Sequence, residues 1–365
     1  MARRLATVVL VTVSLTIAAG ACTGPDARDG PAAASAATST VVASPTGSGS
    51  PGPPTTTATP SPSASASGGS VRFSVLGDID ATDAADAVLR SIAARHDDFT
   101  LAVGDLSYGD DGEEMAWCRF VTKRVGATHP FELVSGNHES DGPDGDIDRF
   151  VRCLPNRLPG LVGTYGRQWY VDQPATNPLV RVVMISPALD FGHGSWSYDD
   201  GTTHQSWLKA AVTGARAAGI PWVVVGMHKP CLSVGNYACD PGADVVDVLL
   251  DTGVDLVVTG HEHLYQRTKP LALGAGCRTI RPGRFSPACI ATGGGTTFVT
   301  VGTGGTGLRE VHGSDSERGY FAALSGRNRK PAYGSLDVRV SADRLTATFV
   351  PVAGGTFTDR LVLTR

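Results

Sequence analysis

From Val71 to the C-terminus, short apolar runs alternate with amphipathic segments, and this alternation restricts the possible folds more than any other feature. Short apolar runs are typical of strands, and amphipathic segments between them are typical of helices that cover a sheet. The pattern predicts an α/β domain. Strands are expected at residues 71–78, 99–105, 131–137, 168–172, 179–186, 221–228 and 254–260, and helices at 82–96, 113–125, 204–219 and 243–253. The C-terminal third is expected to contain strands only, at 296–305, 333–341, 344–352 and 356–364.

The first 70 residues differ in composition and are expected to lie outside this domain. Residues 1–22 combine Arg3 and Arg4 with an apolar stretch that ends in small residues, which is typical of an export signal. This stretch is too short, and too interrupted by threonine and serine, for a spanning helix. Cys22 follows the small residues as in a bacterial lipobox and is expected to carry a lipid anchor, with ordinary signal cleavage as the alternative. Residues 23–70 are almost entirely Ala, Ser, Thr, Pro and Gly, which predicts a disordered linker to a domain at 71–365.

The cysteines and the net charge restrict compartment and partners. If Cys22 is lipidated, six of the seven cysteines remain, an even number that an oxidising compartment favours. The expected disulfides join Cys231 to Cys239, Cys277 to Cys289 and Cys118 to Cys153. There is no CxxC spacing to indicate a zinc ribbon or a redox dithiol. The formal charge of −4 does not indicate the excess of positive charge that is typical of nucleic-acid-binding proteins, so nucleic acid is not an expected partner.

Polar residues come at the ends of five of the expected strands. These ends read GDID at 77–80, GDLSY at 104–108, GNHE at 136–139, VGMH at 225–228 and GHEH at 260–263. Taken singly, each is explained by ordinary turn chemistry or by an isolated histidine of the core or surface. Open α/β sheets, however, place their sites beyond the carboxyl ends of strands. Five such turns together therefore predict one site of carboxylate, phenol, amide and imidazole donors.

This ordered set resembles the calcineurin-like metallophosphoesterases, and within them the purple acid phosphatases, whose pattern is GDxG, GDxxY, GNH(D/E), VxxH and GHxH. The stretches YQRT after GHEH, HQSWL before the fourth motif, and VTVGTGG with the later YGSLDVRVSADRLTATFVP also match. The resemblance covers residues 71–365 and implies two mixed β-sheets packed together and flanked by helices. It also implies a phosphatase that hydrolyses phosphomonoesters by attack of a metal-bound hydroxide.

The resemblance implies two metal sites that share one carboxylate. One metal would be held by Asp78, Asp105, Tyr108 and His263, and the second by Asp105, Asn137, His228 and His261. A phenolate ligand suits Fe(III), so the implied pair of ions is Fe(III) with Fe(II), Zn or Mn. The two-residue spacing lets both imidazoles of HEH reach the same side of the chain, while Glu262 points away. His138 is the implied proton donor or phosphate ligand, unless it only orients a neighbouring metal ligand.

The chain departs from the family pattern at Asp80, where glycine is expected. This carboxylate could approach the site and disfavour an anionic substrate, or it could turn into solvent. Larger family members carry additional histidines in the segment that follows the fourth motif, and this chain has none there. Lys229, Asn236 and Tyr237 could meet the substrate instead, as could His193, or they could be solvated loop residues.

Three functions stay open at this point. The first is a phosphatase acting on a small phosphate ester, and the second is a phosphodiesterase that uses the same two metals. The third is a surface protein that keeps the fold and binds a partner without turnover. In each case we expect an exported protein of the cell envelope, anchored to the outer face of the membrane through Cys22 or, alternatively, secreted. The oligomeric state is left open.

Overall fold

The computed structural model of the chain describes residues 69–365, apart from 141, 143, 155, 353 and 354. The expected export signal, Cys22 and the linker up to residue 68 lie outside the described residues, so the division of the chain near residue 70 stays a prediction. In the part of the chain that the structure describes, no helix has both the length and the apolar character needed to cross a membrane.

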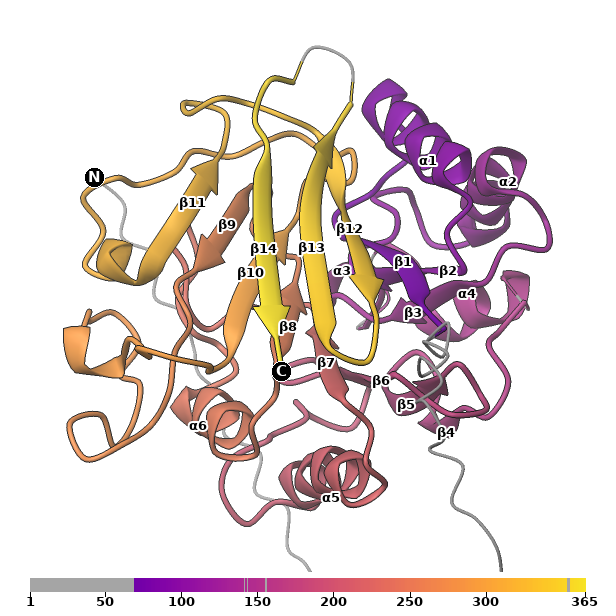
Figure 1. Ribbon diagram of the computed structural model, residues 1–365. Coiled ribbons are helices and arrows are strands. Elements are labelled where there is room, and N and C mark those ends of the chain that lie inside the picture. The colour runs from indigo at the N-terminus through magenta and orange to yellow at the C-terminus, as the bar shows by residue number, and fades with distance from the viewer. Residues whose placement is uncertain (1–68, 141, 143, 155, 353–354) are drawn as a thin grey trace, which may run out of the picture. The chain divides into compact units, whose positions relative to one another are not determined.

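The first sheet joins the beginning and the end of the described chain. Its strands are β1 (Val71–Leu76), β2 (Phe99–Val103), β3 (Phe131–Val134), β12 (Gly334–Val340), β13 (Arg344–Pro351) and β14 (Asp359–Thr364), in the order β14-β13-β12-β1-β2-β3. Strands β1 to β3 pair in parallel, whereas β12 pairs antiparallel with both β1 and β13. The yellow C-terminal strands of Figure 1 therefore continue the sheet that begins with the indigo strand β1.

The second sheet is also mixed. Its strands are β4 (Val162–Thr164), β5 (Gln168–Gln173), β6 (Val180–Ile185), β7 (Trp222–Met227), β8 (Leu256–Thr259), β9 (Tyr265–Thr268), β10 (Thr297–Val301) and β11 (Phe321–Ser325), in the order β11-β9-β10-β8-β7-β6-β5-β4. The central strands β6, β7, β8 and β10 pair in parallel, and the strands at both edges pair antiparallel. Two mixed sheets in one domain confirm the implied architecture.

Alternate residues of the central strands face two different cores. Val224 of β7 packs between the sheets in the same core as Val75 of β1. Its neighbours Val223 and Val225 pack in a second core on the other face of the second sheet. Because successive side chains point to opposite faces, a strand buried on both faces is a continuous apolar run. The run PWVVVGM is such a strand.

Helices complete both cores. They are α1 (Asp83–Arg95), α2 (Glu114–Val125), α3 (Asn137–Ser140), α4 (Ile147–Cys153), α5 (Thr203–Ala217) and α6 (Ala243–Asp251). Leu89 of α1 and Trp117 of α2 are buried in the first core, and Leu208 of α5 is buried in the second. In Figure 1 helices α1 and α2 lie beside the first sheet, while α5 and α6 lie beside each other. Helix α1 begins after Thr82, whose hydroxyl accepts a hydrogen bond from the backbone N–H of Ala85 at 3.1 Å, as expected for an N-cap.

The prediction that the C-terminal third contains strands only was wrong. Two short 3₁₀ helices, Pro287–Cys289 and Arg318–Tyr320, interrupt it. The short elements α3, α4, β4, β9 and β11 were also not predicted as elements. Strand β9 escapes a hydropathy pattern because it buries polar side chains: Gln266 is fully buried and donates to Ser233 Oγ at 3.2 Å and Thr300 Oγ1 at 3.1 Å. Hydrogen bonds with residues far away in sequence place it in the sheet.

The three expected disulfides are confirmed. They join Cys118 to Cys153, Cys231 to Cys239 and Cys277 to Cys289. The first ties α2 to α4, and the other two close loops of the second half of the chain. Disulfides form and persist in oxidising compartments, so this pattern fits an exported protein.

A partly buried ion pair links the two sheets. Asp359 at the start of β14 accepts hydrogen bonds from Arg267 Nε at 2.5 Å and Nη2 at 2.9 Å, and from Tyr265 Oη at 2.8 Å, both residues of β9. Burial opposes ionisation of Asp359, but the bonds from Arg267 and Tyr265 outweigh it and hold the pKa of this carboxyl below its ordinary value.

We expect Asp359→Asn to destabilise the domain, because the change leaves the partly buried Arg267 without its counter-charge. Loss of hydrogen bonds between charged groups costs about 1.5–3 kcal/mol. A depressed pKa in the folded state means that the stabilisation is present above the carboxyl pKa of the unfolded chain and is lost as pH falls through the folded value. Urea unfolding should show a large difference near neutral pH that shrinks in acid, and a difference independent of pH would contradict the assignment.

Candidate metal centre

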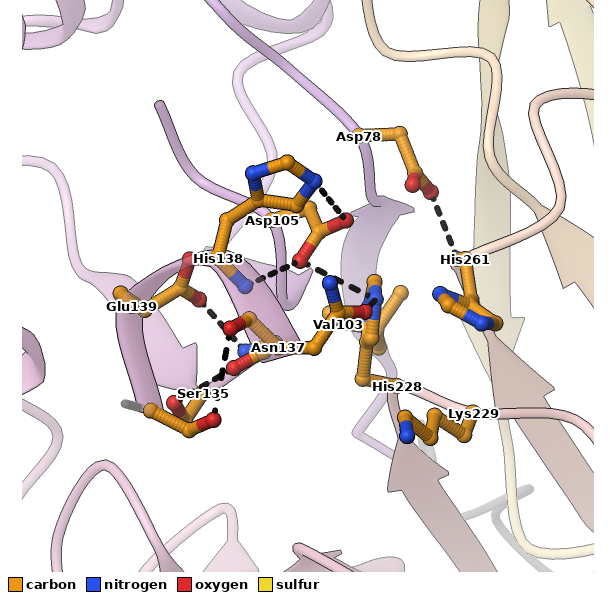
Figure 2. A network of polar contacts seen from close by, with 12 residues as sticks. Asp78, Val103, Asp105, Ser135, Asn137, His138, Glu139, His228, Lys229 and His261 are labelled. Carbon is orange, nitrogen blue, oxygen red and sulfur yellow. Dashed lines mark hydrogen bonds and ion pairs between the residues drawn. The ribbon is translucent and has the colours of Figure 1, made fainter. Parts of the chain in front are cut away.

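The expected donors gather where strands of both sheets end. Asp78 lies just beyond β1, Asp105 just beyond β2, and Asn137 at the start of α3, which follows β3. From the second sheet, His228 directly follows β7 and His261 comes just after β8. Figure 2 shows that these five side chains converge on one place. The site is thus built at the carboxyl ends of strands from both sheets, where α/β folds commonly bind ligands.

Left-handed backbone brings the two aspartates and one histidine into place. The φ angles of Asp78, Asp105 and His261 are 58°, 48° and 67°, in a region that non-glycine residues adopt at a cost of about 1–3 kcal/mol. Gly136 is required for a different reason, because a Cβ there would lie 2.1 Å from Asp105 Oδ1. The glycines and aspartates of these turns therefore do more than reverse the chain. Without a side chain at Gly136, the backbone of this turn can lie directly against the carboxylate of Asp105.

One group of donors surrounds Oδ1 of Asp105. Ligand atoms of Asp105, His228 and His261 all lie within 4.8 Å of one another, and all three residues are buried. His228 Nε2 is 3.1 Å from Asp105 Oδ1 and 3.2 Å from Asn137 Oδ1. The four residues expected to hold the second metal are thus together.

A second group surrounds the other oxygen of the same carboxylate. Ligand atoms of Asp78, Asp105 and His263 lie within 4.8 Å of one another. Tyr108 Oη is 3.3 Å from Asp105 Oδ2, 3.3 Å from Asp78 Oδ1 and 3.2 Å from His263 Nε2. All seven predicted ligands are therefore in one cluster, with Asp105 common to both groups. Their role as metal ligands stays a prediction.

Backbone carbonyls orient two of the imidazoles. His228 Nδ1 is 2.9 Å from the carbonyl oxygen of Val103, and His263 Nδ1 is 3.0 Å from that of Gly307. A carbonyl can only accept, so it favours a proton on Nδ1 and leaves the lone pair of Nε2 facing the cluster. This arrangement is the usual one for histidines that bind a metal.

Burial and charge set the protonation of the cluster. Burial, followed by the charge of His228, lowers the pKa of His261 to about 2, and burial together with Arg309 lowers that of His263 to about 4. Burial raises the pKa of Asp78 to about 7. Burial also opposes ionisation of Asp105, but His228 outweighs it and holds the pKa of this carboxyl below its ordinary value. His261 and His263 are thus neutral, as a cation requires of an imidazole ligand. Burial opposes the charge of His228, but Asp105 outweighs it and raises the pKa of this imidazole to about 9, so a cation would have to displace the proton of its Nε2. With that proton released, the residues present fit a metal pair.

His138 lies at the open side of the cluster. Its Nε2 is 3.6 Å from Asp105 Oδ2, its backbone N–H donates to Asp105 Oδ1 at 3.2 Å, and its Nδ1 contacts the carboxylate of Asp144. The imidazole also packs on Tyr108 with ring centres 4.4 Å apart. Unlike the fully buried His228, its side chain is 27% exposed, so it is open to solvent while Asp144 fixes its orientation.

Glu262 points away from the cluster, as expected. Its Oε1 accepts hydrogen bonds from the backbone N–H of Tyr237 at 2.6 Å and from Ser233 Oγ at 3.1 Å. Through these bonds it holds the loop closed by the Cys231–Cys239 disulfide against the HEH motif. The loop brings the ring of Tyr237 onto the imidazole of His261, stacked at 4.0 Å.

The remaining candidates have local partners or face solvent. Asp80 has a φ of 65°, which explains why the family pattern has glycine here, and its Oδ1 accepts from the backbone N–H of Ala81 at 2.7 Å. Lys229 Nζ pairs with the Asp240 carboxylate at 2.9 Å, and the side chains of Asn236 and His193 are exposed. Among the described residues, Asp80 makes no hydrogen bond to a candidate ligand.

Two residues near the cluster were not assigned a role from sequence. Glu139 is fully buried and accepts from the backbone N–H of Gly136 at 2.5 Å and of Leu106 at 3.3 Å, which braces the turns around Asp105. Arg309 donates from Nη1 to the carbonyl oxygen of His261 at 3.2 Å, and its guanidinium lies 4.7 Å from the centre of the Tyr237 ring. Glu139 is the last residue of the GNHE motif and could have been suspected. Arg309 lies in a loop shortly after the VTVGTGG stretch but belongs to none of the five strand-end motifs, and no sequence signal marks it.

A family model described as calcineurin-like phosphoesterase matches residues 71–265. The chain belongs to this family. Its similarity to curated proteins is of the purple acid phosphatase type: Purple acid phosphatase 18 of Arabidopsis thaliana is 26% identical over 245 residues, 64% of this chain and 50% of that protein. Fe(3+)-Zn(2+) purple acid phosphatase 12 of the same plant is 27% identical over 252 residues, again 64% and 50%. The chain thus spans about half the length of these relatives.

Solved structures support the fold. Purple acid phosphatase PPD1 from yellow lupin seeds superimposes with a TM-score of 0.58 and 16% identity, over 82% of this chain and 54% of that one. At this identity the likeness concerns the fold alone. The expected sandwich of two mixed sheets with flanking helices is confirmed.

Proposed function

We propose that this protein hydrolyses phosphomonoesters with the help of two bound metal ions. The observation that carries the proposal is the position of Asp105, whose Oδ1 faces His228 while its Oδ2 faces Tyr108. A carboxylate with donors on both sides can be shared by two cations. One cation would be held by Asp78, Asp105, Tyr108 and His263, and the other by Asp105, Asn137, His228 and His261.

When bound, such a pair of cations lowers the pKa of water and neutralises phosphoryl oxygens. A phenolate oxygen is a hard anionic donor, so the side with Tyr108 is proposed for Fe(III), and the other side for Fe(II), Zn or Mn. The relative whose name specifies Fe(3+) and Zn(2+) supports this pairing. The residues of the chain supply the geometry: Val103 and Gly307 orient the imidazoles, and Glu139 braces the turns that carry Asp105.

His138 is proposed to hand a proton to the leaving oxygen. A general acid has to be within reach of solvent and substrate and has to be held in one orientation. His138 meets both conditions, since its side chain is 27% exposed and Asp144 contacts its Nδ1. Its Nε2 faces the Asp105 side of the cluster, where a substrate phosphoryl group would lie.

Arg309 is proposed to attract the anionic substrate. Among the described residues no carboxylate pairs with it, and its guanidinium lies between the His261 carbonyl and the Tyr237 ring. We expect Arg309→Gln to raise KM for a phosphomonoester about tenfold with a smaller effect on kcat, because a hydrogen bond to a charged group contributes about 1.5–3 kcal/mol. Arg327→Gln is the matched control, since Arg327 is exposed and its Nη2 binds Glu310 at 2.9 Å. Equal KM values for the two variants would remove Arg309 from the substrate site.

The direct test is hydrolysis of a chromogenic phosphomonoester and of the matching diester, from acid to neutral pH, by protein purified without chelator. Faster cleavage of the monoester supports the proposal. Faster cleavage of the diester favours the alternative, a phosphodiesterase with the same ligands. If a metal-loaded protein cleaves neither ester, the remaining alternative is a binding protein that keeps the fold.

Export to the cell envelope is part of the same proposal. Three disulfides in one domain fit an oxidising compartment. The sequence of residues 1–22 supports an export signal, and Cys22 is proposed to carry a lipid, with secretion as the alternative. Mass spectrometry of the N-terminal peptide from the native host distinguishes a lipidated Cys22 from an ordinary cleaved terminus.

A further inference from the structure

A cavity outside the candidate metal centre is lined by three arginines. It has a volume of about 490 Å³, and its lining includes Arg278, Arg281, Arg284, Phe285 and Tyr320. None of its lining residues is a candidate metal ligand. The three arginines fall within seven residues of a chain whose formal charge is −4. The cavity is therefore a local concentration of positive charge in an acidic protein.

The backbone that carries these arginines is fixed at several points. The Cys277–Cys289 disulfide closes the segment 277–289, which we call the arginine loop. Within it, the backbone N–H of Gly283 donates to Glu317 Oε1 at 2.6 Å, and that of Ser286 donates to Tyr320 Oη at 3.0 Å. A loop held in this way loses little further freedom when a ligand binds, which favours affinity.

The guanidinium groups themselves have no counter-charge among the described residues. No carboxylate pairs with Arg278, Arg281 or Arg284, and all three are exposed. Among the described residues, the carboxylates that accept hydrogen bonds from the loop are Asp247 and Glu317, and both accept from backbone N–H groups. The positive charge of the loop is thus left for a ligand from outside.

We propose that this cavity binds a multivalent anion that carries two or more phosphate groups. The planar fork of a guanidinium matches two oxygens of a phosphate, and three forks around one cavity match more than one phosphate. The volume of about 490 Å³ is in the range of small-molecule sites. The same chemistry could be presented by a free oligophosphate or by the headgroups of anionic lipids. This site is separate from the proposed hydrolysis and does not depend on it.

The experiment is calorimetric titration of the full-length, metal-loaded protein with methylenediphosphonate, whose P–C–P linkage resists hydrolysis. The native protein is compared with the triple variant Arg278→Ser/Arg281→Ser/Arg284→Ser. We expect the triple variant to bind at least about tenfold more weakly at the loop, because hydrogen bonds between charged groups are lost. Any binding at the metal centre is common to both proteins, and the difference between them reports on the loop. We also expect the affinity difference to shrink as salt rises, since exposed charges are screened.

The matched control removes the same charge elsewhere. In Arg119→Ser/Arg344→Ser/Arg360→Ser three exposed arginines outside the cavity are replaced. This control should bind like the native protein. If the control variant weakens binding as much as the loop variant does, the proposal is overturned. It is also overturned if neither variant changes binding of the diphosphonate and the vesicle measurement below shows no difference between the proteins. Thermal melting and hydrolysis should be unchanged in both triple variants, and the single variant Arg281→Ser serves if the loop variant fails to fold.

A second measurement separates the two sources of phosphate. Sedimentation with vesicles of phosphatidylglycerol and phosphatidylcholine is compared with sedimentation with phosphatidylcholine alone. Arginine-dependent binding to the mixed vesicles would assign the cavity to lipid headgroups, and arginine-dependent binding of the diphosphonate alone would assign it to a soluble ligand.

Discussion

Asp105→Ala is expected to abolish phosphoester hydrolysis, with a loss of at least about a thousandfold. Removal of a single electrostatic contributor to a transition state commonly costs 10²–10³. Asp105 contributes to both donor groups at once, since its Oδ1 faces His228 and its Oδ2 faces Tyr108. The variant should therefore lose affinity for both metals, which elemental analysis of the purified protein measures separately from activity.

Asp80→Gly is the matched control for this variant. Asp80 also lies in the loop after a strand of the first sheet and has left-handed backbone, but its carboxylate accepts a hydrogen bond from the backbone N–H of its own neighbour Ala81. We expect metal content and activity to stay within a few-fold of the native protein, since glycine also suits this φ. An Asp105→Ala protein that remains folded and keeps its full activity would overturn the assignment of both metal sites.

Tyr108→Phe is expected to bleach the iron-loaded protein. Burial raises the pKa of the Tyr108 phenol well above its ordinary value, and the charges of Asp78 and Asp105 raise it further. Without a cation this side chain therefore stays a neutral phenol, which has no charge-transfer absorption. If Fe(III) binds where the resemblance implies, the phenolate forms as its ligand, and the visible band that gives purple acid phosphatases their colour follows. The measurement is the visible spectrum of the iron-loaded native protein and of the variant.

Tyr237→Phe is the control for the colour. Tyr237 also lies at the site, stacked on His261 at 4.0 Å, but it is not an expected ligand. Its replacement should leave the visible band in place. A band that survives in Tyr108→Phe and disappears in Tyr237→Phe would exchange the roles of the two tyrosines. Iron content has to be equal in all three proteins for the comparison to hold.

Most of the framework could be predicted from residue patterns. Central strands such as β7 are continuous apolar runs because both of their faces are buried. Such a run can be recognised in the sequence without knowing which strands lie beside it in the sheet. The N-cap at Thr82 and the disulfide pairs also follow from local spacing and cysteine number. Strand β9 could not be predicted in this way, because Gln266 and Arg267 satisfy their polar groups with distant partners.

The candidate site divides in the same manner. Its donor types and their order are local properties, since each lies in a short turn after an apolar strand. The role proposed for Arg309 at the edge of the site is not local, because it depends on the contact of one loop with His261 and Tyr237. The arginine cavity is a similar case, because a charged run in sequence is ordinarily a solvated surface, and only the folded loop shows that its arginines line one cavity.

The sequence by itself determined which side chains are available at strand ends, because turn chemistry and apolar periodicity act over a few residues. Only the tertiary structure decided that turns from two different sheets meet, so that one carboxylate lies between two sets of donors. The physical reason is that packing of the two sheets buries a shared core assembled from strands far apart in the chain. That packing brings His228 and His261 of the second sheet to Asp78 and Asp105 of the first.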